Sequence, residues 1–579
     1  MKRYWKYIKP YLPAFILGPL MMIVEVIGEV VLPKFMSLII NNGVAERNVP
    51  YIINMGLIMI LTAVLMALGG IGGAYFGAKA SINFAADLRK DAFANVQTFS
   101  FKNIDDFSTG SLVTRLTNDI TQVQSLINMM LRMALRAPGM LIGAVFMAFS
   151  INSQLAIIIV IVLPVLIGTI ALIIRTAFPR FQALQEKMDK LNSTIREGVT
   201  NIRVVKSFVR RDFEQEKFEE ASEDLKDTSL RATRVMIIAF PLMGFFMNIT
   251  TLAVVWFGGK QLLVGGMLLG DLTAFITYVT QILMALIFTS MVVLQSSRAI
   301  ASGKRINEVI DCKSDITDTD AKYPDRKVES GAVEFKDVTF RYYKKSDAPV
   351  LDKVSFKIGS GETFGIIGST GSGKTTLVSM IARLYDPDCG EVLVDNVNVK
   401  DFSLYNLRES VSMVLQKNVL FSGSIMENLK WGSEDATEEE IRKVADMAQA
   451  DGFVTGFLDG YETDLGQGGV NVSGGQKQRL CIARAMLKKP KILILDDSTS
   501  AVDTATEAAI RANLKDYCPE TTKIIIAQRI SSVVEADKIL VLDDGKVVGL
   551  GNHSELMESC EAYKEIYYSQ MDKEKEANA

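Results

Sequence analysis

The sequence predicts two domains of different kinds: an all-α domain of six membrane-spanning helices at residues 1–311 and an α/β domain at 332–579. Six apolar stretches, each close to the roughly 20 residues that a spanning helix needs, lie before residue 300. The polar segment 312–331, which contains Pro324, then reads as a linker. Beyond it, short apolar runs typical of strands accompany a glycine-rich loop, as in an α/β domain.

The six apolar stretches set the membrane topology. Their approximate limits are 14–36, 52–74, 129–151, 155–174, 236–257 and 272–294. The long connections at 75–128 and 175–235 are rich in lysine and arginine, whereas the three short connections hold only Arg47 and Lys260. Because cytoplasmic loops carry an excess of basic residues, we expect the long loops and both termini in the cytoplasm and the protein in the inner or plasma membrane.

The long loops contain helix-forming charged residues interleaved with apolar ones, so we expect the spans to continue as helices into the cytoplasm. The loop tips are predicted near 103–111 and 211–215, where they either contact another domain or form solvated hairpins. A net charge of −3 excludes nucleic acid as the main partner. Five cysteines without a Cys-x-x-Cys pair indicate neither a disulfide framework nor a zinc site.

Residues 368–376 form a complete phosphate-binding loop between an apolar run at 363–367 and a helix-forming segment at 377–384. Its glycines allow backbone N–H groups to cradle phosphate oxygens, Lys374 reaches the β and γ phosphates, and the Thr375 hydroxyl can bind Mg²⁺. The loop predicts binding of a nucleoside triphosphate. Its residues are Gly368, Ser369, Thr370, Gly371, Ser372, Gly373, Lys374, Thr375 and Thr376.

Two further segments carry residues suited to phosphate chemistry. The apolar run 491–495 ends in Asp496 and Asp497, which is how a Mg²⁺-associated aspartate is presented beside a phosphate loop. Asp496 is the expected metal-side residue. The Ser-Gly-Gly-Gln at 473–476 opens a helix whose backbone N–H groups would suit a γ-phosphate presented by another molecule.

These motifs occur in the order typical of ABC transporters: the phosphate loop, Gln416 after an apolar run, Val-Ser-Gly-Gly-Gln at 472–476, the strand that ends at Asp496, and Ser-Ala-Val-Asp at 500–503. Residues 108–118 and 270–275 also resemble that family, so the resemblance covers nearly the whole chain. The sequence therefore resembles one half of an ABC exporter, in which a membrane domain is fused to a P-loop ATPase domain.

The resemblance implies ATP and Mg²⁺ as cofactors and assigns further roles. Tyr342 would stack on adenine, Gln416 would contact Mg²⁺ and sense the loop tips, and Asp503 would belong to the D-loop. The signature that closes over the ATP of a partner subunit would be Ser473, Gly474, Gly475 and Gln476. The implied partners are a second exporter half, the lipid bilayer and a small amphiphilic transport substrate, either drug-like or lipid-like, with a peptide cargo as the alternative.

Two positions depart from the family pattern. Asp497 stands where the family places a glutamate as general base, and Gln528 stands where it places a switch histidine. The shorter side chain withdraws the carboxylate by about 1.5 Å, the length of one C–C bond, from a site that needs contact within about 3 Å. Gln528 can still donate to a γ-phosphate, so binding should survive better than hydrolysis. The alternative is that Asp497 acts through an intervening water.

An impaired site beside an intact signature resembles the degenerate-site member of heterodimeric multidrug exporters. In that arrangement the signature of this chain completes the active site of its partner, while its own phosphate loop serves the weak site. Two alternatives remain: a homodimeric exporter with slow ATPase, and a nucleotide-gated regulator or channel.

Glu25 and Glu29 lie four residues apart in the first span and therefore on one helix face. An ionised carboxylate at mid-bilayer costs about 2.5–3.5 kcal/mol, so both should face the interior of the helix bundle. They either recognise a cationic or polar substrate, or they bond to neighbouring helices or are protonated. The many methionines of the spans likewise either line a substrate pocket or pack against lipid.

Overall fold

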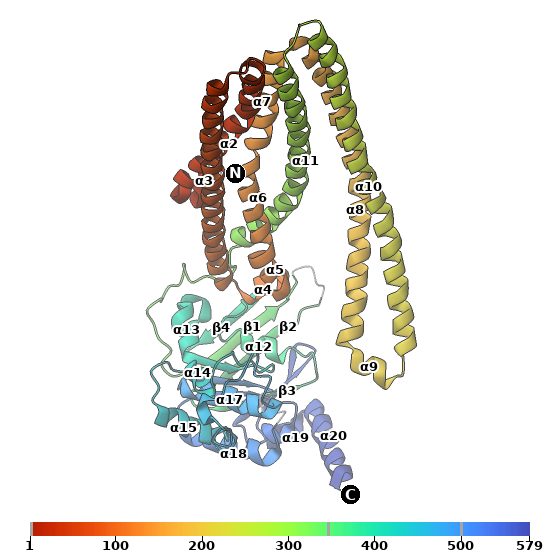
Figure 1. Cartoon of the computed structure of the whole chain (residues 1–579). Helices are drawn as coiled ribbons and strands as arrows, with labels where there is room; N and C mark the ends of the chain where they lie inside the picture. Colours follow the sequence, from red (N-terminus) through yellow and green to blue (C-terminus); the bar gives the residue numbers. More distant parts are fainter. Residues whose placement is uncertain (1–3, 344–347, 498–501, 579) are drawn as a thin grey trace. The chain divides into compact units, whose positions relative to one another are not determined.

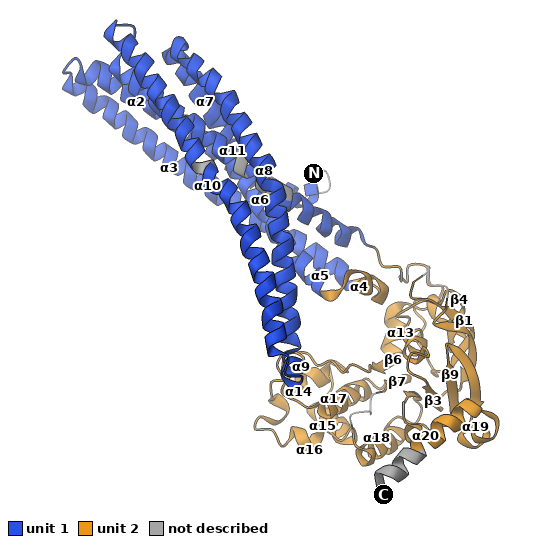
Figure 2. Ribbon diagram, turned by 90° about the vertical axis from the view of Figure 1, so that its right-hand side faces the viewer, with its two compact units in different colours: residues 1–97, 110–312 blue, residues 98–109, 313–579 orange. Residues whose placement is uncertain are grey.

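The computed structural model of the chain describes residues 4–343, 348–497 and 502–578. They form two compact units (Figure 2). The first unit contains residues 1–97 and 110–312, and the second contains 98–109 and 313–579. The sequence pattern predicts that residues 98–109 belong to the membrane domain. In the structure this part of the first long loop, which includes helix α4 (Phe101–Phe107), packs with the second unit.

The first unit is all helical (Figure 1). Its helices are α1 (Trp5–Ile8), η2 (Lys9–Tyr11), α2 (Leu12–Leu38), η3 (Ile39–Val44), α3 (Val49–Gln97), α5 (Thr109–Thr114), η4 (Arg115–Asp119), α6 (Ile120–Met133), α7 (Arg136–Ile151), α8 (Ser153–Thr200), α9 (Ile202–Ser207), α10 (Arg211–Leu263) and α11 (Leu269–Asp311). Among the described residues, six helical segments are long and apolar enough to cross a membrane. The predicted set of six spans is therefore confirmed.

The predicted continuation of the spans as long helices is also observed. Helices α8 and α10 pack side by side along their length and are joined by the short helix α9 (Figure 1). The sequence predicts the second loop tip near 211–215. This prediction is wrong, because α10 already begins at Arg211. Asp212 and Glu214 in its first turn favour a helix N-terminus there. The turn instead occupies residues 201–210 around α9.

The third span is broken between α6 and α7, although the sequence analysis expected one continuous stretch at 129–151. Pro138 lacks a backbone N–H, and its ring would clash with the carbonyl of the residue four positions earlier, Ala134. Ala134 and Leu135 accordingly form a turn between the two helices. This break places Arg136 at the start of α7, where it faces the two glutamates described below.

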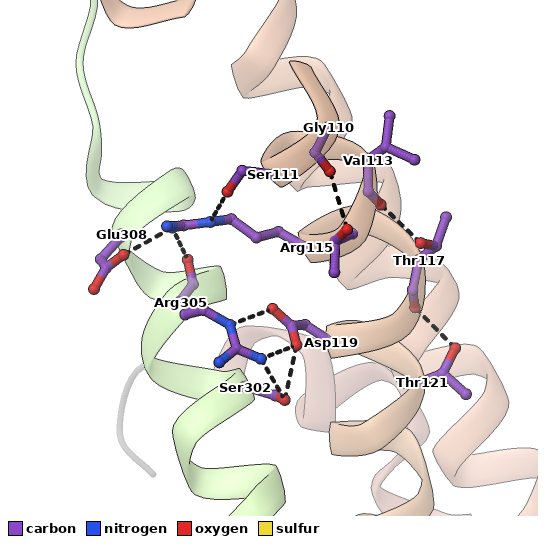
Figure 3. A network of polar contacts seen from close by, with 11 residues as sticks. Gly110, Ser111, Val113, Arg115, Thr117, Asp119, Thr121, Ser302, Arg305 and Glu308 are labelled. Carbon is purple, nitrogen blue, oxygen red and sulfur yellow. Dashed lines mark hydrogen bonds and ion pairs between the residues drawn. The ribbon is translucent and has the colours of Figure 1, made fainter. Parts of the chain in front are cut away.

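A polar network joins the start of the third span to α11 (Figure 3). The carboxylate of Asp119, which is 3% exposed, accepts hydrogen bonds from the Arg305 guanidinium and, at 2.9 Å, from the Ser302 hydroxyl. One turn away, Arg115 donates to the backbone oxygen of Arg305 at 2.8 Å and pairs with Glu308 at 2.7 Å. A buried charge needs such a partner, so this network fixes η4 against α11.

The second unit is an α/β fold. Among its described residues, ten strands form two sheets: β1 (Val333–Phe340), β2 (Leu351–Ile358), β3 (Thr363–Gly368), β4 (Cys389–Val394), β5 (Val397–Asn398), β6 (Val411–Val414), β7 (Ile492–Asp496), β8 (Thr522–Ile526), β9 (Lys538–Asp543) and β10 (Lys546–Gly551). The antiparallel sheet has the order β2-β1-β4-β5. The second sheet has the order β10-β9-β3-β8-β7-β6, parallel except for β10.

The helices of the second unit complete its two cores. Besides α4, they are α12 (Lys374–Ser379), η5 (Val399–Asp401), α13 (Leu404–Ser410), α14 (Ile425–Lys430), α15 (Glu438–Met447), α16 (Asp451–Val454), η6 (Gly460–Glu462), α17 (Gly474–Leu487), α18 (Thr504–Tyr517), η7 (Ile530–Ser532), α19 (His553–Ser559) and α20 (Glu561–Asn578). One buried cluster lies between the two sheets, and another lies between the larger sheet and α14, α15, α17 and α18. The predicted fold class, a helical membrane domain followed by an α/β domain, is confirmed.

Asp119→Asn should destabilise the first unit, because it keeps the shape of the side chain but leaves Arg305 without its charged partner. We expect a loss of about 2 kcal/mol in the free energy of unfolding, measured by thermal denaturation of the purified protein. Asp91→Asn is the matched control, since Asp91 and Lys6 form an exposed ion pair that should contribute under about 1 kcal/mol. An equal effect of the two variants would contradict this role for the buried network.

Candidate nucleotide-binding site

The larger sheet brings the predicted phosphate-binding residues to one edge. Strand β3 pairs in parallel with β8, and β8 pairs with β7, so that Asp496 lies opposite Ile526. The phosphate loop follows β3, Asp496 ends β7, and Gln528 follows β8. Because the carboxyl ends of parallel strands meet at the same edge, residues more than 100 positions apart form one site.

The phosphate loop adopts the backbone that its glycines permit. Gly371 and Gly373 have φ angles of +88° and +95°, which side chains with a Cβ rarely adopt. A Cβ at Gly373 would also lie 2.8 Å from Leu351 and 2.9 Å from the backbone oxygen of Val350. Lys374 Nζ donates to the carbonyls of Gly368 and Ser369 at 2.9 and 2.7 Å, so the loop curls around its own ammonium group.

Two buried oxygens at this edge have no hydrogen-bond partner among the described residues: Asp496 Oδ2 and Ser372 Oγ. Such groups are costly to bury alone, and a carboxylate beside the Thr375 hydroxyl is a ligand set that suits Mg²⁺ bound to a phosphate. Burial raises the pKa of Asp496, and the nearby Asp497 adds to this, against a hydrogen bond from Thr375. These residues therefore fit Mg²⁺ and a nucleotide phosphate.

Asp497 is held by two glutamines. Gln528 Nε2 donates to Asp497 Oδ2 at 2.8 Å, and the Gln416 side chain also hydrogen-bonds to this carboxylate. Burial raises the pKa of Asp497, although these two hydrogen bonds act to lower it. Its backbone lies in the left-handed region, with φ +48°, where aspartate is tolerated better than most residues. The two departures from the family pattern thus contact each other directly.

Tyr342 lies between the antiparallel sheet and the phosphate-loop helix. Its hydroxyl forms a 2.8 Å hydrogen bond with Thr376 Oγ1. Its ring packs edge-on against Phe340 and Tyr385, at centroid distances of 5.0 and 5.3 Å, and is 38% exposed. Tyr385 in turn donates to Asp105 of α4 at 3.0 Å. An exposed ring fixed beside the phosphate loop is suited to stack on a base.

The signature residues begin α17. Ser473 caps this helix and exchanges hydrogen bonds with Gln476, whose N–H donates to Ser473 Oγ and whose Oε1 accepts from the Ser473 N–H. Ser473 and Gly474 are exposed, so this helix start is open to a second molecule. Asp503 caps α18 by accepting a hydrogen bond from the Thr506 N–H at 3.0 Å. Ser500 and Ala501 of the predicted D-loop lie outside the described residues.

Glu25 and Glu29 lie in the other unit and share one partner. Arg136 Nη2 is 3.1 Å from Glu25 Oε1 and 3.3 Å from Glu29 Oε2. Both carboxylates point into the helix bundle, as their positions in the span required.

Comparison with known families decides what these two units are. The profile of the ABC transporter transmembrane region matches residues 15–286, and the ABC transporter profile matches residues 351–500. An uncharacterised ABC transporter ATP-binding protein of Bacillus subtilis, YfiB, is 37% identical over 99% of both chains.

The chain belongs to the ABC transporter family. An uncharacterised ABC transporter ATP-binding protein of Mycobacterium tuberculosis, Rv1273c, is 36% identical over 98% of this chain and 97% of its own. A solved bacterial Atm1-family ABC exporter with ATP bound has the same fold, with a TM-score of 0.79. It is 24% identical and covers 96% of this chain and 98% of its own. This ABC transporter is thus a multi-pass membrane protein with a fused ATPase domain.

The structure adds residues to the ABC site that sequence reasoning missed. Gln478, buried in α17, donates to the backbone oxygen of Asp497 at 3.3 Å and so connects the signature helix to the general-base position. Tyr385 connects the ring of Tyr342 to α4. Gln478 directly follows the Val-Ser-Gly-Gly-Gln motif, but the motif does not indicate its contact with Asp497, and the context of Tyr385 carries no motif.

The raised pKa of Asp496 predicts how Mg²⁺-dependent ATP binding responds to pH. Its carboxyl group takes up a proton at a higher pH than an ordinary aspartate, and protonation competes with Mg²⁺ as the pH falls. We expect the difference in Mg²⁺-ATP affinity between the unaltered chain and Asp496→Asn, measured by calorimetry, to narrow from pH 7.5 to pH 5. The same difference at both pH values would contradict this assignment of the metal ligand.

Proposed function

We propose that this chain is one half of a heterodimeric ABC exporter that moves small amphiphilic, drug-like or lipid-like compounds across the cytoplasmic membrane. Its own phosphate loop binds Mg²⁺-ATP through the edge of the larger sheet but hydrolyses it poorly. Its signature, Ser473 to Gln476, completes the active site on the phosphate loop of a dissimilar partner. In this arrangement the termini and long loops lie in the cytoplasm.

The observation that carries this proposal is the contact between Asp497 and Gln528. A general base must approach the attacking water within about 3 Å, and the aspartate side chain is one methylene shorter than glutamate. Its Oδ2 atom also accepts a hydrogen bond from the Gln528 amide at 2.8 Å, and a hydrogen bond to the charged form of a carboxylate weakens it as a base. Gln528 lacks the imidazole of a switch histidine, and the Asp497 carboxylate is already hydrogen-bonded. Hydrolysis is therefore impaired, while phosphate binding by Lys374 and the loop is retained.

The exposed helix start at Ser473 supports the role of the signature. Its capping box leaves the outer N–H groups of α17 directed away from the helix, where an anion on another subunit is favoured. ABC exporters function as dimers in a membrane, and in a head-to-tail pair each site combines residues of both subunits. A mixed dimer can therefore hold one impaired and one active site.

The α9 tip and one cavity support assembly with a second subunit. Phe208 and Val209 beside α9 are 73% and 87% exposed, which is unusual for apolar residues on a solvated hairpin. The second unit separately contains a cavity of about 310 Å³ whose wall includes the stacked rings of Phe421 and Trp431. We infer that the corresponding tip of the partner docks in this cavity and transmits closure of the ATPase domains to the spans.

The test restores the two missing groups in this chain. Asp497→Glu combined with Gln528→His should raise the steady ATPase rate of the purified single chain at least tenfold, because a positioned general base contributes about 10²–10⁴-fold. The matched control, Asp497→Asn with Gln528→His, should remain as slow as the unaltered chain.

Two other outcomes would change the assignment. Rapid ATP hydrolysis by the unaltered single chain, abolished by Asp497→Asn, would instead identify a homodimeric exporter. Failure of the chain and its partner to move a fluorescent amphiphile against its gradient in ATP-loaded vesicles would favour a nucleotide-gated regulator or channel.

A further inference from the structure

The last described helix, α20, contacts the switch loop, residues 527–531, which follows β8 and presents Gln528. The contact is made by the side chain of Gln570. Its Nε2 atom donates to the backbone oxygen of Gln528 at 2.7 Å, and its Oε1 atom accepts from the backbone N–H of Ile530 at 2.9 Å. One amide side chain thus satisfies an acceptor and a donor of the same loop, as a neighbouring peptide group would.

The switch loop is also held at both of its ends. The Ala527 N–H donates to the backbone oxygen of Ile366 in β3 at 3.2 Å. Arg511 of α18 donates from Nη1 to the backbone oxygen of Ser531 at 2.6 Å. Gln570 binds the loop between these two points. Because the side chain presented by the loop is exposed, its direction depends on the backbone that carries it.

Helix α20 is itself anchored to the core of the second unit. Tyr563 is fully buried, and its hydroxyl is 2.8 Å from Nδ1 of His553 at the start of α19. Ile566 and Tyr567 pack against the buried cluster on the helix-covered side of the larger sheet. Gln570 lies seven, four and three residues after these three anchors and therefore on the same helix face. The packed face of α20 thus delivers Gln570 to the switch loop.

We propose that Gln570 is a positioning residue for the γ-phosphate end of the nucleotide site. It holds the switch loop so that Gln528 stays beside Asp497, to which Gln528 Nε2 donates one N–H at 2.8 Å. A glutamine amide carries two N–H groups, so the second is left for a phosphate oxygen. Without this hold the loop must be ordered when the phosphate binds, which opposes binding. The role of Gln528 rests on the proposed function, whereas the hold on the loop does not.

Substitutions at Gln570 can separate its two hydrogen bonds. Glutamate has nearly the same shape but no N–H, so Gln570→Glu keeps the acceptor for Ile530 and places a carboxylate against the backbone oxygen of Gln528. Gln570→Ala removes both bonds. Ser569 is exposed in α20, so Ser569→Glu adds the same charge one position away and is the matched control.

Hydrogen exchange of the full-length chain in lipid nanodiscs, without nucleotide, tests the hold itself. Gln570→Ala should speed exchange in the peptide that contains residues 528–531 at least tenfold, because the protecting partner of the Ile530 N–H is lost. Exchange in the phosphate loop should stay unchanged, and Ser569→Glu should behave as the unaltered chain. Unchanged exchange of the switch loop in Gln570→Ala, or an equal change in the control, would overturn the inference.

Nucleotide selectivity tests whether the hold acts through Gln528. In calorimetry, Gln570→Glu and Gln570→Ala should each weaken Mg²⁺-ATP binding about fivefold. Binding of Mg²⁺-ADP should be unchanged, because ADP has no γ-phosphate for Gln528 to bind. Gln528→Ala should cause at least the same loss, and adding Gln570→Ala to it should cause no further loss. Equal losses for ATP and ADP, or losses that add, would reduce Gln570 to a structural role and contradict the proposal.

The outcomes distinguish this inference from the proposed function. Faster exchange and an ATP-selective loss in Gln570→Ala, in a chain that alone hydrolyses ATP rapidly, would uphold the inference and refute the proposed function. A slow chain that is activated by Asp497→Glu with Gln528→His, but whose switch loop does not respond to Gln570→Ala, would do the reverse.

Discussion

The hydrogen bond between Gln528 and Asp497 is the interaction on which the account of this ATPase depends. It exists because β7 and β8 are neighbours in a parallel sheet, so the residues that follow them reach the same edge. That edge also receives the phosphate loop after β3 and the buried carboxylate of Asp496. The sheet thus places the phosphate loop and Asp496 beside Asp497, the proposed general-base position, whose carboxylate is already hydrogen-bonded to Gln528. In the proposed function, ATP binding and ATP hydrolysis depend on different residues of this edge, so that hydrolysis is lost while binding is kept.

Much of the fold was predictable because its signals are local. Spans are continuous apolar stretches, and the phosphate loop, the Asp-ended strand and the signature are contiguous motifs beside strands or helices of the expected kind. The second loop tip was misplaced because the charged residues at 211–215 suit a helix start as well as a loop. The break before α7 depends on a single proline within an otherwise suitable span.

The contacts of the site were less predictable, because they join segments distant in the chain. Spacing places Glu25 and Glu29 on one helix face but does not identify Arg136, more than 100 residues later, as their shared partner. Likewise, no local pattern indicates that Gln478 reaches the carbonyl of Asp497 or that Tyr385 links Tyr342 to α4. Such roles follow from helix packing and strand order, which only the three-dimensional structure supplies.

The most direct test of an ATP site that binds without hydrolysing is the identity of the nucleotide retained on this chain. The assembled transporter would be incubated under turnover conditions with 8-azido-ATP labelled at either the α or the γ phosphate. The bound nucleotide would then be photocrosslinked to the protein, and the two subunits would be separated. We predict equal α and γ label on this chain, because its bound ATP remains intact. Retention of the α label with loss of the γ label on this chain would show that its own site hydrolyses ATP and would contradict the account.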